Sequence, residues 1–474
     1  MDKQLHVHFM GICGSGAASI ALLSVKSGFK VTGCDQNTDS YYAGELKKEG
    51  VEIFKGHDES HLKDVDIVAV SPALFDVNPD NPELLRAKEL GILMTWQQFM
   101  GEYLQKGKKV IAVSGTHGKT TTTFLASEML IEGEKNPTAL GGSVYNKWGT
   151  GGRFGKSELF ICEADEFNRN FYHYKPETAV LNNVEMDHPE CFKDFEDVLS
   201  AFVHFVTAPK TVKTMILNGD SAGTLEVLKR TEKDPVISEA QVYLIFKDTV
   251  KPVESAHKNL HFVTYHVTEK GEYGSRFELT MDGETTTFHT VLTGEYNVSN
   301  AATAAVIART KGVCDEAIAN TLENFVGAGR RFDKVGMLRN VPVYDDYAHH
   351  PTEISSVLTM CREYFPAKKI LAIFEPHQIS RLTLMFDGYV NALTIAHHVV
   401  IWKTHIGREI HSGVTPIAAE RWENASPRIR YEEDTEEIVK YANELIDKGE
   451  CDLIVVIGAA SSYLVSRRLV KEGE

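Results

Sequence analysis

The chain has 474 residues, of which 43% are apolar and 24% charged, and its formal net charge is −16 at pH 7. A chain of this length exceeds one ordinary hydrophobic core, so we expect two to four domains. The acidic balance argues against broad binding to nucleic acid or to an anionic membrane.

From the sequence we expect neither a membrane span nor a signal peptide. No run approaches the roughly 18 apolar residues that a span needs, and Met1–Phe9 lacks the basic and apolar regions of a signal peptide. The seven cysteines are scattered without a CxxC pair or a metal-binding spacing, which favours free thiols in a reducing compartment. We therefore expect a cytoplasmic protein, a monomer or a homodimer, with neither nucleic-acid nor membrane partners.

The first block, residues 1–106, alternates strand-like and helical segments. Strand-like runs occur at 5–11, 30–35 and 66–72, and helical segments occur at 17–28 and 43–50. This alternation predicts a parallel sheet with crossover helices, that is, a Rossmann-like domain.

A glycine-rich turn joins the first strand of this block to its first helix. Gly11 and Gly16 take the first and third positions of a dinucleotide fingerprint, Cys13 takes the second, and Asp35 ends the next strand. The Cβ of Cys13 hinders the close approach of a pyrophosphate, so a purely structural tight turn remains an alternative. Ser71 follows the third strand, at the edge where such sheets contact ligands.

The second block, residues 107–328, opens with a strand at 108–115 and continues through strands at 159–165 and 178–184. Between residues 240 and 292 the pattern changes to short alternating segments with turn residues between them. We expect these segments to form a small antiparallel sheet, inserted in or flanking the same domain.

The strongest motif is VSGTHGKTTTT at 113–123. A strand ends at Ser114 and a helix begins at Thr120, so backbone N–H groups and the positive end of the helix face the turn, where they can hold phosphate. Lys119 can reach the β- and γ-phosphates, and the Thr120 hydroxyl can hold Mg²⁺. Val113 departs from the strict GxxxxGK[ST] rule, so a Gly-Lys-Thr turn without a ligand is the alternative.

The third block, residues 329–474, alternates again, with strand-like runs at 341–347, 368–374, 397–402 and 452–458. The pattern predicts a second Rossmann-like domain. The fold class expected for the whole chain is therefore α/β with three domains: a Rossmann-like domain, a central P-loop ATPase-like domain with a small antiparallel sheet, and a C-terminal Rossmann-like domain.

Six motifs, in order along the chain, resemble those of the Mur ligases, which are ATP-dependent enzymes of cell-wall synthesis. They are GTHGKTTT at 115–122, EADE at 163–166, LNNVEMDH at 181–188, GEYNVSN at 294–300, GRRFD at 329–333 and YDDYAHHPTE at 344–353. Each motif is weak alone, but their order and spacing together are highly specific.

The resemblance implies that ATP activates a carboxylate as an acyl phosphate, with Mg²⁺ as cofactor, and that an amine then displaces phosphate. The implied catalytic residues are Lys119, Glu163, His188 and Arg331, and the implied metal-holding residues are Thr120, Glu163 and His188. The implied ATP-binding residues are Gly115, Thr116, His117, Gly118, Lys119, Thr120, Thr121, Asn297, Asn300, Arg331 and Asp346.

Each of these roles has a structural alternative. Glu163 could be a solvated acid at a strand end, and His188 could be a helix-start residue. Asp346 could belong to an ordinary strand-end turn. Asn297 and Asn300 could be helix caps, although a cap can also touch a nucleotide.

The Mur ligases hold the diphosphate of a UDP-sugar with a similar glycine-rich loop in their first domain. The resemblance therefore implies UDP-sugar contacts in the first block, from Gly11, Gly14, Ser15, Gly16, Asp35 and Ser71.

The segments at 345–353 and 375–381 look most like the branch of the family that joins L-alanine to UDP-N-acetylmuramate. The implied amino-acid-binding residues are Tyr347, His350, His377 and Arg381. Gln378 stands where that branch usually has an arginine, which leaves Arg381 as the expected partner of the amino acid's carboxylate. The stretch 195–206 contains no lysine, so we expect none of the lysine carbamate that several family members carry.

Three other functions remain open on the sequence. The runner-up is a ligase that joins a whole peptide to UDP-N-acetylmuramate, which the Gly-Ile-Cys-Gly opening at 11–14 favours. An NAD(P)-dependent oxidoreductase built on the first block belongs to a different class. A nucleotide-binding regulator without chemistry is disfavoured by the intact Lys119, Thr120, Glu163 and His188.

Overall fold

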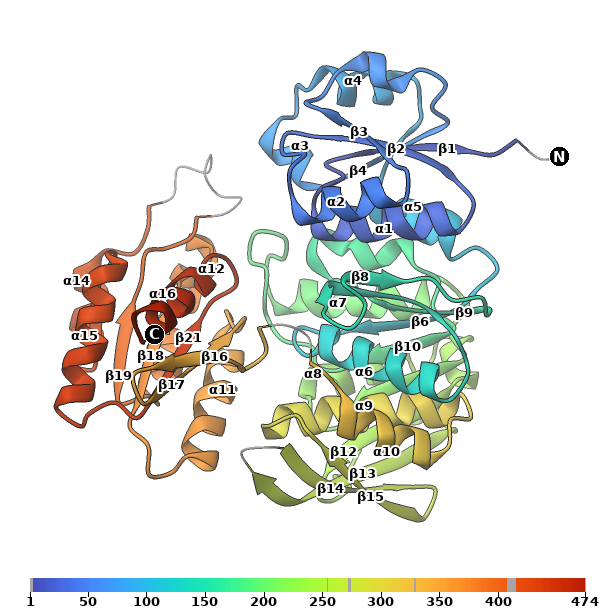
Figure 1. Cartoon of the computed structure of the whole chain (residues 1–474). Helices are drawn as coiled ribbons and strands as arrows, with labels where there is room; N and C mark the ends of the chain where they lie inside the picture. The colour runs from blue at the N-terminus through green and yellow to red at the C-terminus, as the bar shows by residue number, and fades with distance from the viewer. Residues whose placement is uncertain (1–2, 254, 272–273, 328–329, 407–414, 474) are drawn as a thin grey trace.

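The computed structural model of the chain describes residues 3–253, 255–271, 274–327, 330–406 and 415–473. Three sheets follow one another along the chain, and Figure 1 shows them as three bodies. The predicted boundary after residue 106 falls between the first two sheets. The boundary after residue 328, like Gly329 of the GRRFD motif, lies outside the described residues.

The first sheet is parallel, with the strand order β3-β2-β1-β4-β5. Its strands are β1 (His6–Met10), β2 (Lys30–Asp35), β3 (Glu52–Lys55), β4 (Ile67–Val70) and β5 (Leu93–Thr95). Its helices are α1 (Ser15–Lys26), α2 (Tyr41–Lys48), η1 (Glu59–Leu62), α3 (Ala73–Val77), α4 (Pro82–Glu89), α5 (Trp96–Phe99) and η2 (Met100–Leu104).

Successive residues of a strand point to opposite faces of its sheet, and β1 is buried on both faces. Val7 and Phe9 belong to the apolar cluster that includes α1, whereas Met10 belongs to the cluster that includes Leu84 of α4. His8 therefore points to the α4 face, together with Met10.

The second sheet has ten strands in the order β15-β14-β13-β12-β11-β10-β6-β9-β7-β8. They are β6 (Lys109–Ser114), β7 (Thr138–Tyr145), β8 (Thr150–Arg153), β9 (Leu159–Glu163), β10 (Thr178–Leu181), β11 (Thr214–Asn218), β12 (Gln241–Lys247), β13 (Leu260–Gly271), β14 (Gly274–Met281) and β15 (Glu284–Thr290). Its helices are α6 (Lys119–Glu132), η3 (Phe167–His173), α7 (Phe195–Thr207), α8 (Ala222–Thr231), η4 (Ile237–Glu239), α9 (Glu295–Thr310) and α10 (Asp315–Asn324).

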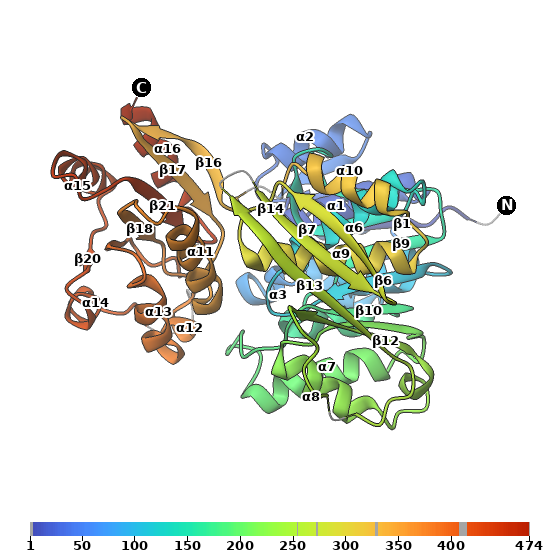
Figure 2. The ribbon, with the colours of Figure 1, turned by 90° about the horizontal axis from the view of Figure 1, so that it is seen from below.

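The antiparallel segments expected between residues 240 and 292 are present, and they extend the central sheet. β12 pairs in parallel with β11 and β13, and only β13, β14 and β15 pair antiparallel at this edge (Figure 2). Only two residues, 282 and 283, separate β14 from β15, which suits antiparallel neighbours, since parallel neighbours need long crossovers.

The third sheet has the strand order β16-β17-β21-β18-β19-β20 and lies beside the second domain (Figure 1). Its strands are β16 (Asp333–Leu338), β17 (Val341–Asp346), β18 (Ile370–Phe374), β19 (His398–Ile401), β20 (Ile429–Tyr431) and β21 (Leu453–Ile457). Its helices are α11 (Pro351–Tyr364), α12 (Ile379–Leu384), α13 (Phe386–Leu393), α14 (Ala419–Ala425), α15 (Thr435–Asp447) and α16 (Tyr463–Gly473). Across the described ranges, no helix is both long and apolar enough to cross a bilayer.

Candidate active site between the second and third domains

The glycine loop between β6 and α6 is shaped by two glycines with positive φ. Gly115 has φ 135° and Gly118 has φ 79°. A Cβ on Gly118 would lie 2.3 Å from Oδ1 of Asn300, and one on Gly115 would lie 3.0 Å from the backbone N of Asn183. The loop can pass this close to its neighbours only without side chains at these positions.

The side chain of Lys119 folds back over this loop. Its Nζ donates to the carbonyl oxygens of Gly115 at 2.6 Å and Thr116 at 3.2 Å, and it pairs with the Glu166 carboxylate at 2.9 Å. Burial works against the charge of Lys119, but the carboxylates of Glu166, Asp165 and Glu163 outweigh burial and raise the pKa of the amine. Lys119 is therefore a fixed cation at the loop.

Glu163 lies beside Thr120 because β9 pairs directly with β6. Val113 faces Glu163 in the register of the two strands, so both strands deliver their last residues to the same edge. The Thr120 hydroxyl donates to Glu163 at 2.8 Å, and the Gly142 N–H donates to the same oxygen at 2.7 Å. A hydroxyl and a carboxylate together are suitable hard donors for Mg²⁺.

His188 lies beside the other end of the EADE motif. One ligand atom from each of Asp165, Glu166 and His188 lies within 4.8 Å of the others, close enough to hold one metal ion. Burial lowers the pKa of His188, but Asp187 and Glu190 outweigh it and raise the pKa above its usual value. The structure thus groups His188 with Asp165 and Glu166, and Thr120 with Glu163.

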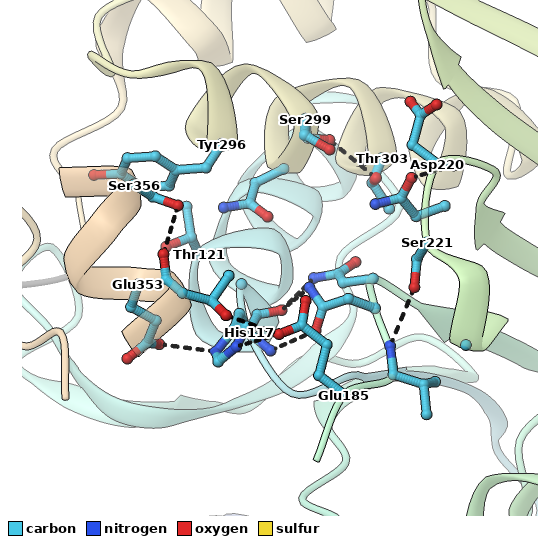
Figure 3. A pocket seen from close by; sticks show the side chains of 18 of the residues that line it. His117, Thr121, Glu185, Asp220, Ser221, Tyr296, Ser299, Thr303, Glu353 and Ser356 are labelled. Atoms are coloured by element: carbon cyan, nitrogen blue, oxygen red, sulfur yellow. Dashed lines mark hydrogen bonds and ion pairs between the residues drawn. The ribbon is translucent and has the colours of Figure 1, made fainter. Parts of the chain in front are cut away.

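A cavity of about 630 Å³ opens beside the loop, between the second and third domains. Figure 3 shows His117 and Thr121 from the loop and α6, Tyr296, Ser299 and Thr303 from α9, and Glu353 and Ser356 from α11. Of the predicted ATP-binding residues, the lining includes His117, Gly118, Thr121, Asn300, Arg331 and Asp346.

The remaining predicted ATP-binding residues lie outside this lining. Gly115 and Thr116 belong to the loop, and Lys119 and Thr120 to the first turn of α6. Asn297 is 3% exposed, and its side-chain amide donates to the Thr293 carbonyl at 2.8 Å, so it stabilises the start of α9. Asn300, one turn later, faces the loop and accepts from Thr122 at 3.3 Å.

Arg331 and Asp346 come from the third domain and reach the cavity beside Tyr296. The Arg331 guanidinium lies 5.4 Å from the centre of the Tyr347 ring. The Asp346 carboxylate accepts from the backbone N–H groups of Phe332 at 2.8 Å and Ala348 at 2.7 Å. Burial raises the pKa of Asp346 to about 7, although Arg331 and these N–H groups oppose the shift.

Ion pairs and hydrogen bonds hold the third domain against the second. His117 lies between Glu185 at 3.5 Å and Glu353 of α11 at 3.3 Å, and Thr352 donates to Glu185 at 2.9 Å. Burial lowers the pKa of His117, but Glu185 and Glu353 outweigh burial and raise it to about 9. The loop histidine is thus a cation between carboxylates of two domains.

A second set of contacts lies near His188. The Arg381 side chain is 1% exposed, and its Nε lies 2.7 Å from the Asp187 carboxylate. Gln378 donates to Glu190 at 3.0 Å. Within the described ranges, Nη1 of Arg381 and Nδ1 of His377 have no hydrogen-bond partner.

The predicted amino-acid-binding residues occupy different positions around this contact. His377 is half-buried, and its partial burial together with the charges of His349 and Arg381 lowers its pKa to about 3, so the ring is neutral. His350 caps α11 through the N–H of Thr352 at 3.3 Å and approaches the Met186 carbonyl at 3.3 Å. Tyr347 is 37% exposed and covers Arg331.

In the first domain, the predicted UDP-sugar residues meet in the turn after β1. Gly11 has φ 74°, and a Cβ there would lie 3.0 Å from the Cβ of Ser71. The Asp35 carboxylate accepts from the N–H of Cys13 at 2.9 Å, so it holds the turn in shape. A Cβ on Gly16 would lie 2.8 Å from the Trp96 ring.

Gly14 and Ser15 stand at the start of α1, with Gly14 as its N-cap and Ser15 as its first residue. None of the predicted UDP-sugar residues lines the 630 Å³ cavity.

Some residues of the site received no role from the sequence. Asn182, Asn183 and Glu185 contact the glycine loop, and Asp165 and Glu166 surround Lys119 and His188. All of them lie inside motifs quoted above, directly after β9 and β10. Because β9 and β10 flank β6 in the sheet, residues that directly follow these two strands lie beside the glycine loop. Their position after these strands is the feature that could have identified them.

Three family models match the chain in succession. They are "Mur ligase family, catalytic domain" at residues 6–107, "Mur ligase middle domain" at 113–308 and "Mur ligase, glutamate ligase domain" at 330–460. A protein of Aquifex aeolicus named UDP-N-acetylmuramate--L-alanine ligase is 33% identical over 98% of this chain and 97% of its own length. The chain belongs to the Mur ligase family.

Other members of the family are similar over comparable lengths. A protein of the same name from Sulfurihydrogenibium sp. is 32% identical over 99% of this chain and 98% of its own. The structure of UDP-N-acetylmuramate-alanine ligase from Thermotoga maritima matches with a TM-score of 0.74 and 23% identity, covering 99% of both chains. A murein peptide ligase from Psychrobacter arcticus matches with a TM-score of 0.69 and 24% identity, covering 99% of both chains. These structural matches show that the three-domain fold is shared.

Proposed function

We propose that this Mur ligase joins L-alanine to the lactyl carboxylate of UDP-N-acetylmuramate in peptidoglycan precursor synthesis, using ATP and releasing ADP and phosphate. The observation that carries the proposal is full-length similarity, at 32–33% identity, to two proteins named for this reaction. We assign residues 1–106 to the UDP-sugar, 107–328 to ATP and 329–474 to the amino acid. Because its substrates are cytoplasmic metabolites, we place the enzyme in the cytoplasm.

For ATP, the 630 Å³ cavity offers the adenine and ribose a site lined by Asn300 and Asp346, next to the glycine loop. The terminal phosphates would lie at the loop, where the start of α6 and Lys119 supply positive charge. Lys119 would exchange part of its contact with Glu166 for phosphate oxygens. Arg331, which enters the cavity from the third domain, would face the γ-phosphate.

The donor set fits magnesium at two places: Thr120 with Glu163, and His188 with Asp165 and Glu166. Bound Mg²⁺ would neutralise the phosphate oxygens as the substrate carboxylate approaches. The protein's own contribution is to hold these donors. Glu163 is held by the Gly142 N–H at 2.7 Å, and Glu166 by Lys119 at 2.9 Å.

The amine step would take place where Arg381 and His377 face the His188 segment. The acyl phosphate hydrolyses if water reaches it, so the third domain must close over it. The contacts of His117 with Glu353 and of Arg381 with Asp187 support such a closed arrangement. The free Nη1 of Arg381 is available for the carboxylate of L-alanine.

The test is phosphate release by the purified protein with ATP, UDP-N-acetylmuramate and one acceptor at a time: L-alanine, glycine, L-serine or a tripeptide. We expect the highest kcat/KM with L-alanine and no turnover without the UDP-sugar. Preference for the tripeptide would instead establish the peptide-joining alternative. Turnover of NAD(P)H without ATP would refute the ligase assignment.

A further inference from the structure

A cluster of four side chains that could hold a metal ion lies in the first domain, on the face of its sheet that α4 covers. It is separate from the glycine loop of the second domain. We call it the α4-face cluster, and its members are His8, Cys34, His61 and Glu83. One ligand atom from each residue lies within 4.8 Å of all the others. His8, Cys34 and Glu83 are 0% exposed, and the His61 side chain is 13% exposed.

Four different elements deliver these side chains to one point. His8 lies on β1 and Cys34 on the adjacent β2. His61 lies in η1, and Glu83 is the second residue of α4. Such a set has no recognisable spacing in the sequence, because the topology of the sheet alone brings the ligands together.

The hydrogen bonds behind His8 determine which of its ring nitrogens carries the proton. Nδ1 of His6 lies 3.0 Å from the Asp64 carbonyl, which can only accept, so this nitrogen is a donor. In a neutral His6 ring, Nε2 then accepts from the Thr32 hydroxyl at 2.9 Å. That hydroxyl must in turn accept from Nδ1 of His8 at 2.9 Å. Neutral His8 therefore presents an unprotonated Nε2 to the centre of the cluster.

In the neutral His8 ring this lone pair faces a carboxylate oxygen of Glu83. Nε2 of His8 and Oε1 of Glu83 are 2.9 Å apart, yet neither has a hydrogen-bond partner in the described part of the chain. Nδ1 of His61, 3.3 Å from the same oxygen, is also buried and unpartnered. A buried carboxylate oxygen that faces two imidazole nitrogens needs compensating positive charge, and a metal ion bound at this point would supply it.

The distances within the cluster suit a four-coordinate metal ion. With metal–ligand bonds of about 2.0–2.3 Å, the ligand atoms of a tetrahedral site lie about 3.3–3.8 Å apart. Sγ of Cys34 lies 3.2 Å from Oε2 of Glu83, and the two histidine nitrogens lie 2.9 Å and 3.3 Å from Oε1. These values lie at or just below that range, so a small expansion of the cluster would bring them to a metal-bound geometry.

We propose that the α4-face cluster binds one divalent transition-metal ion, with Zn²⁺ as the best match, through His8, Cys34, His61 and Glu83. A thiolate and two imidazoles disfavour Mg²⁺ and Ca²⁺, which prefer oxygen ligands. Protein side chains would fill all four coordination positions of the ion, and no position would remain open for a substrate. The site is also buried, so we assign it a structural role.

A set of supporting hydrogen bonds surrounds the cluster, as metal sites usually require. Thr32 orients His8, and the Asp58 N–H donates to Glu83 at 3.1 Å. Nδ1 of His57 lies 3.1 Å from Sγ of Cys34, where it can donate to the thiolate.

The metal would also stabilise the turn after β1. The carbonyl of Cys34 accepts from the N–H of Gly11 at 2.9 Å and from that of Ile12 at 3.2 Å. Asp35, the next residue, holds the N–H of Cys13. An ion that holds Cys34 in place therefore fixes the backbone on which this turn rests.

The experiment measures metal in the untagged full-length protein. We expect about one Zn²⁺ per chain by elemental analysis after gel filtration, and, after exchange for Co²⁺, the near-ultraviolet thiolate-to-cobalt charge-transfer band. Cys34→Ser and His61→Gln should lose the bound ion, and Cys34→Ser should lose the band. Cys361→Ser, an equally buried cysteine in the third domain, should keep both.

His188→Ala separates this site from metal held in the second domain, because it should leave the thiolate band unchanged. Should Cys34→Ser fail to fold, the band in the wild-type protein and its loss in His61→Gln decide the matter. A folded wild-type protein that shows no thiolate band with Co²⁺ would overturn the proposal. A band that survives in Cys34→Ser would overturn it as well.

Discussion

Nδ1 of His117, in the glycine loop of the second domain, lies 3.3 Å from the carboxylate of Glu353, on the first helix of the third domain. The same Glu353 caps that helix, accepting from the N–H groups of His349 and His350. The glycine loop and the start of the third domain are therefore joined by a charged contact. Any change in this contact changes the closed arrangement of the two domains.

The His117 contact predicts a loss of stability at alkaline pH. Its pKa is raised from the ordinary 6.5 to about 9, so the folded protein binds this proton more tightly than the unfolded chain. The stabilisation is fully present below pH 6.5 and disappears as the pH rises through about 9. At most about 3 kcal/mol of unfolding free energy is involved. Denaturant unfolding between pH 6 and 10 measures it.

Two variants provide the control for this pH dependence. Glu353→Gln removes one of the carboxylates that raise the pKa of His117, so the loss of stability should be smaller and should be complete at lower pH. His117→Gln should remove this component of the pH profile. If the wild type and His117→Gln lose stability in parallel between pH 6.5 and 9, His117 is not the group responsible.

Lys119→Ala should abolish catalysis and also weaken the fold. The variant removes the fixed cation at the loop, and we expect kcat to fall at least about 10²-fold. It also leaves the buried carboxylate of Glu166 without its partner at 2.9 Å, which should cost about 3–5 kcal/mol of unfolding free energy. Phosphate-release assays and chemical denaturation measure the two effects separately.

The double variant Lys119→Ala/Glu166→Gln separates these two losses. Removing the unpaired charge should restore most of the stability, whereas activity should remain low because the cation is still missing. Normal turnover in either variant would contradict the role of Lys119 at the phosphates.

The sequence was sufficient to predict the three α/β domains and the position of the glycine loop, because both depend on local patterns. Strand and helix periodicities mark the sheets, and GTHGKTTT marks the turn between β6 and α6. The placement of Glu163 beside Thr120 also agrees with the predicted pairing of these residues.

Long-range contacts could not be predicted in the same way. Glu166 pairs with Lys119 only because β9 lies next to β6, and the sequence does not state the strand order. Asn297 lies three residues before Asn300 on the same face of α9, but its amide donates to the Thr293 carbonyl four residues earlier. The scattered cysteines showed no metal-binding spacing, yet Cys34 meets two histidines and a glutamate from separate elements.

Gly118→Ala should damage the loop without unfolding the domain. The new Cβ would lie 2.3 Å from Oδ1 of Asn300, and the backbone of the alanine would have to keep φ 79°. Displacement of the loop should reduce kcat/KM for ATP about 10²-fold. Gly91→Ala is the matched control, since Gly91 also has a positive φ, 68°, but a Cβ there would meet no atom of the described residues within 4 Å. It should cost only about 1–2 kcal/mol of stability, and equal kinetic losses in both variants would contradict the steric argument.

Arg381→Lys should affect the amino acid more than the nucleotide. The guanidinium pairs with Asp187 through Nε at 2.7 Å while Nη1 has no partner among the described residues, so one side chain can hold Asp187 and a substrate carboxylate together. Lysine keeps the charge but loses this two-sided geometry. Loss of one charge-assisted hydrogen bond should raise the KM for L-alanine about tenfold.

The KM for ATP should change little in Arg381→Lys, since Arg381 is not among the residues that line the 630 Å³ cavity proposed for ATP. Arg339→Lys is the control on the same domain, because Arg339 pairs with Asp447 on the surface and its replacement should alter neither constant. Steady-state kinetics with each substrate varied in turn distinguishes the two outcomes. An unchanged KM for L-alanine would mean that Arg381 serves only to hold Asp187, and that the amino acid's carboxylate is bound by other residues.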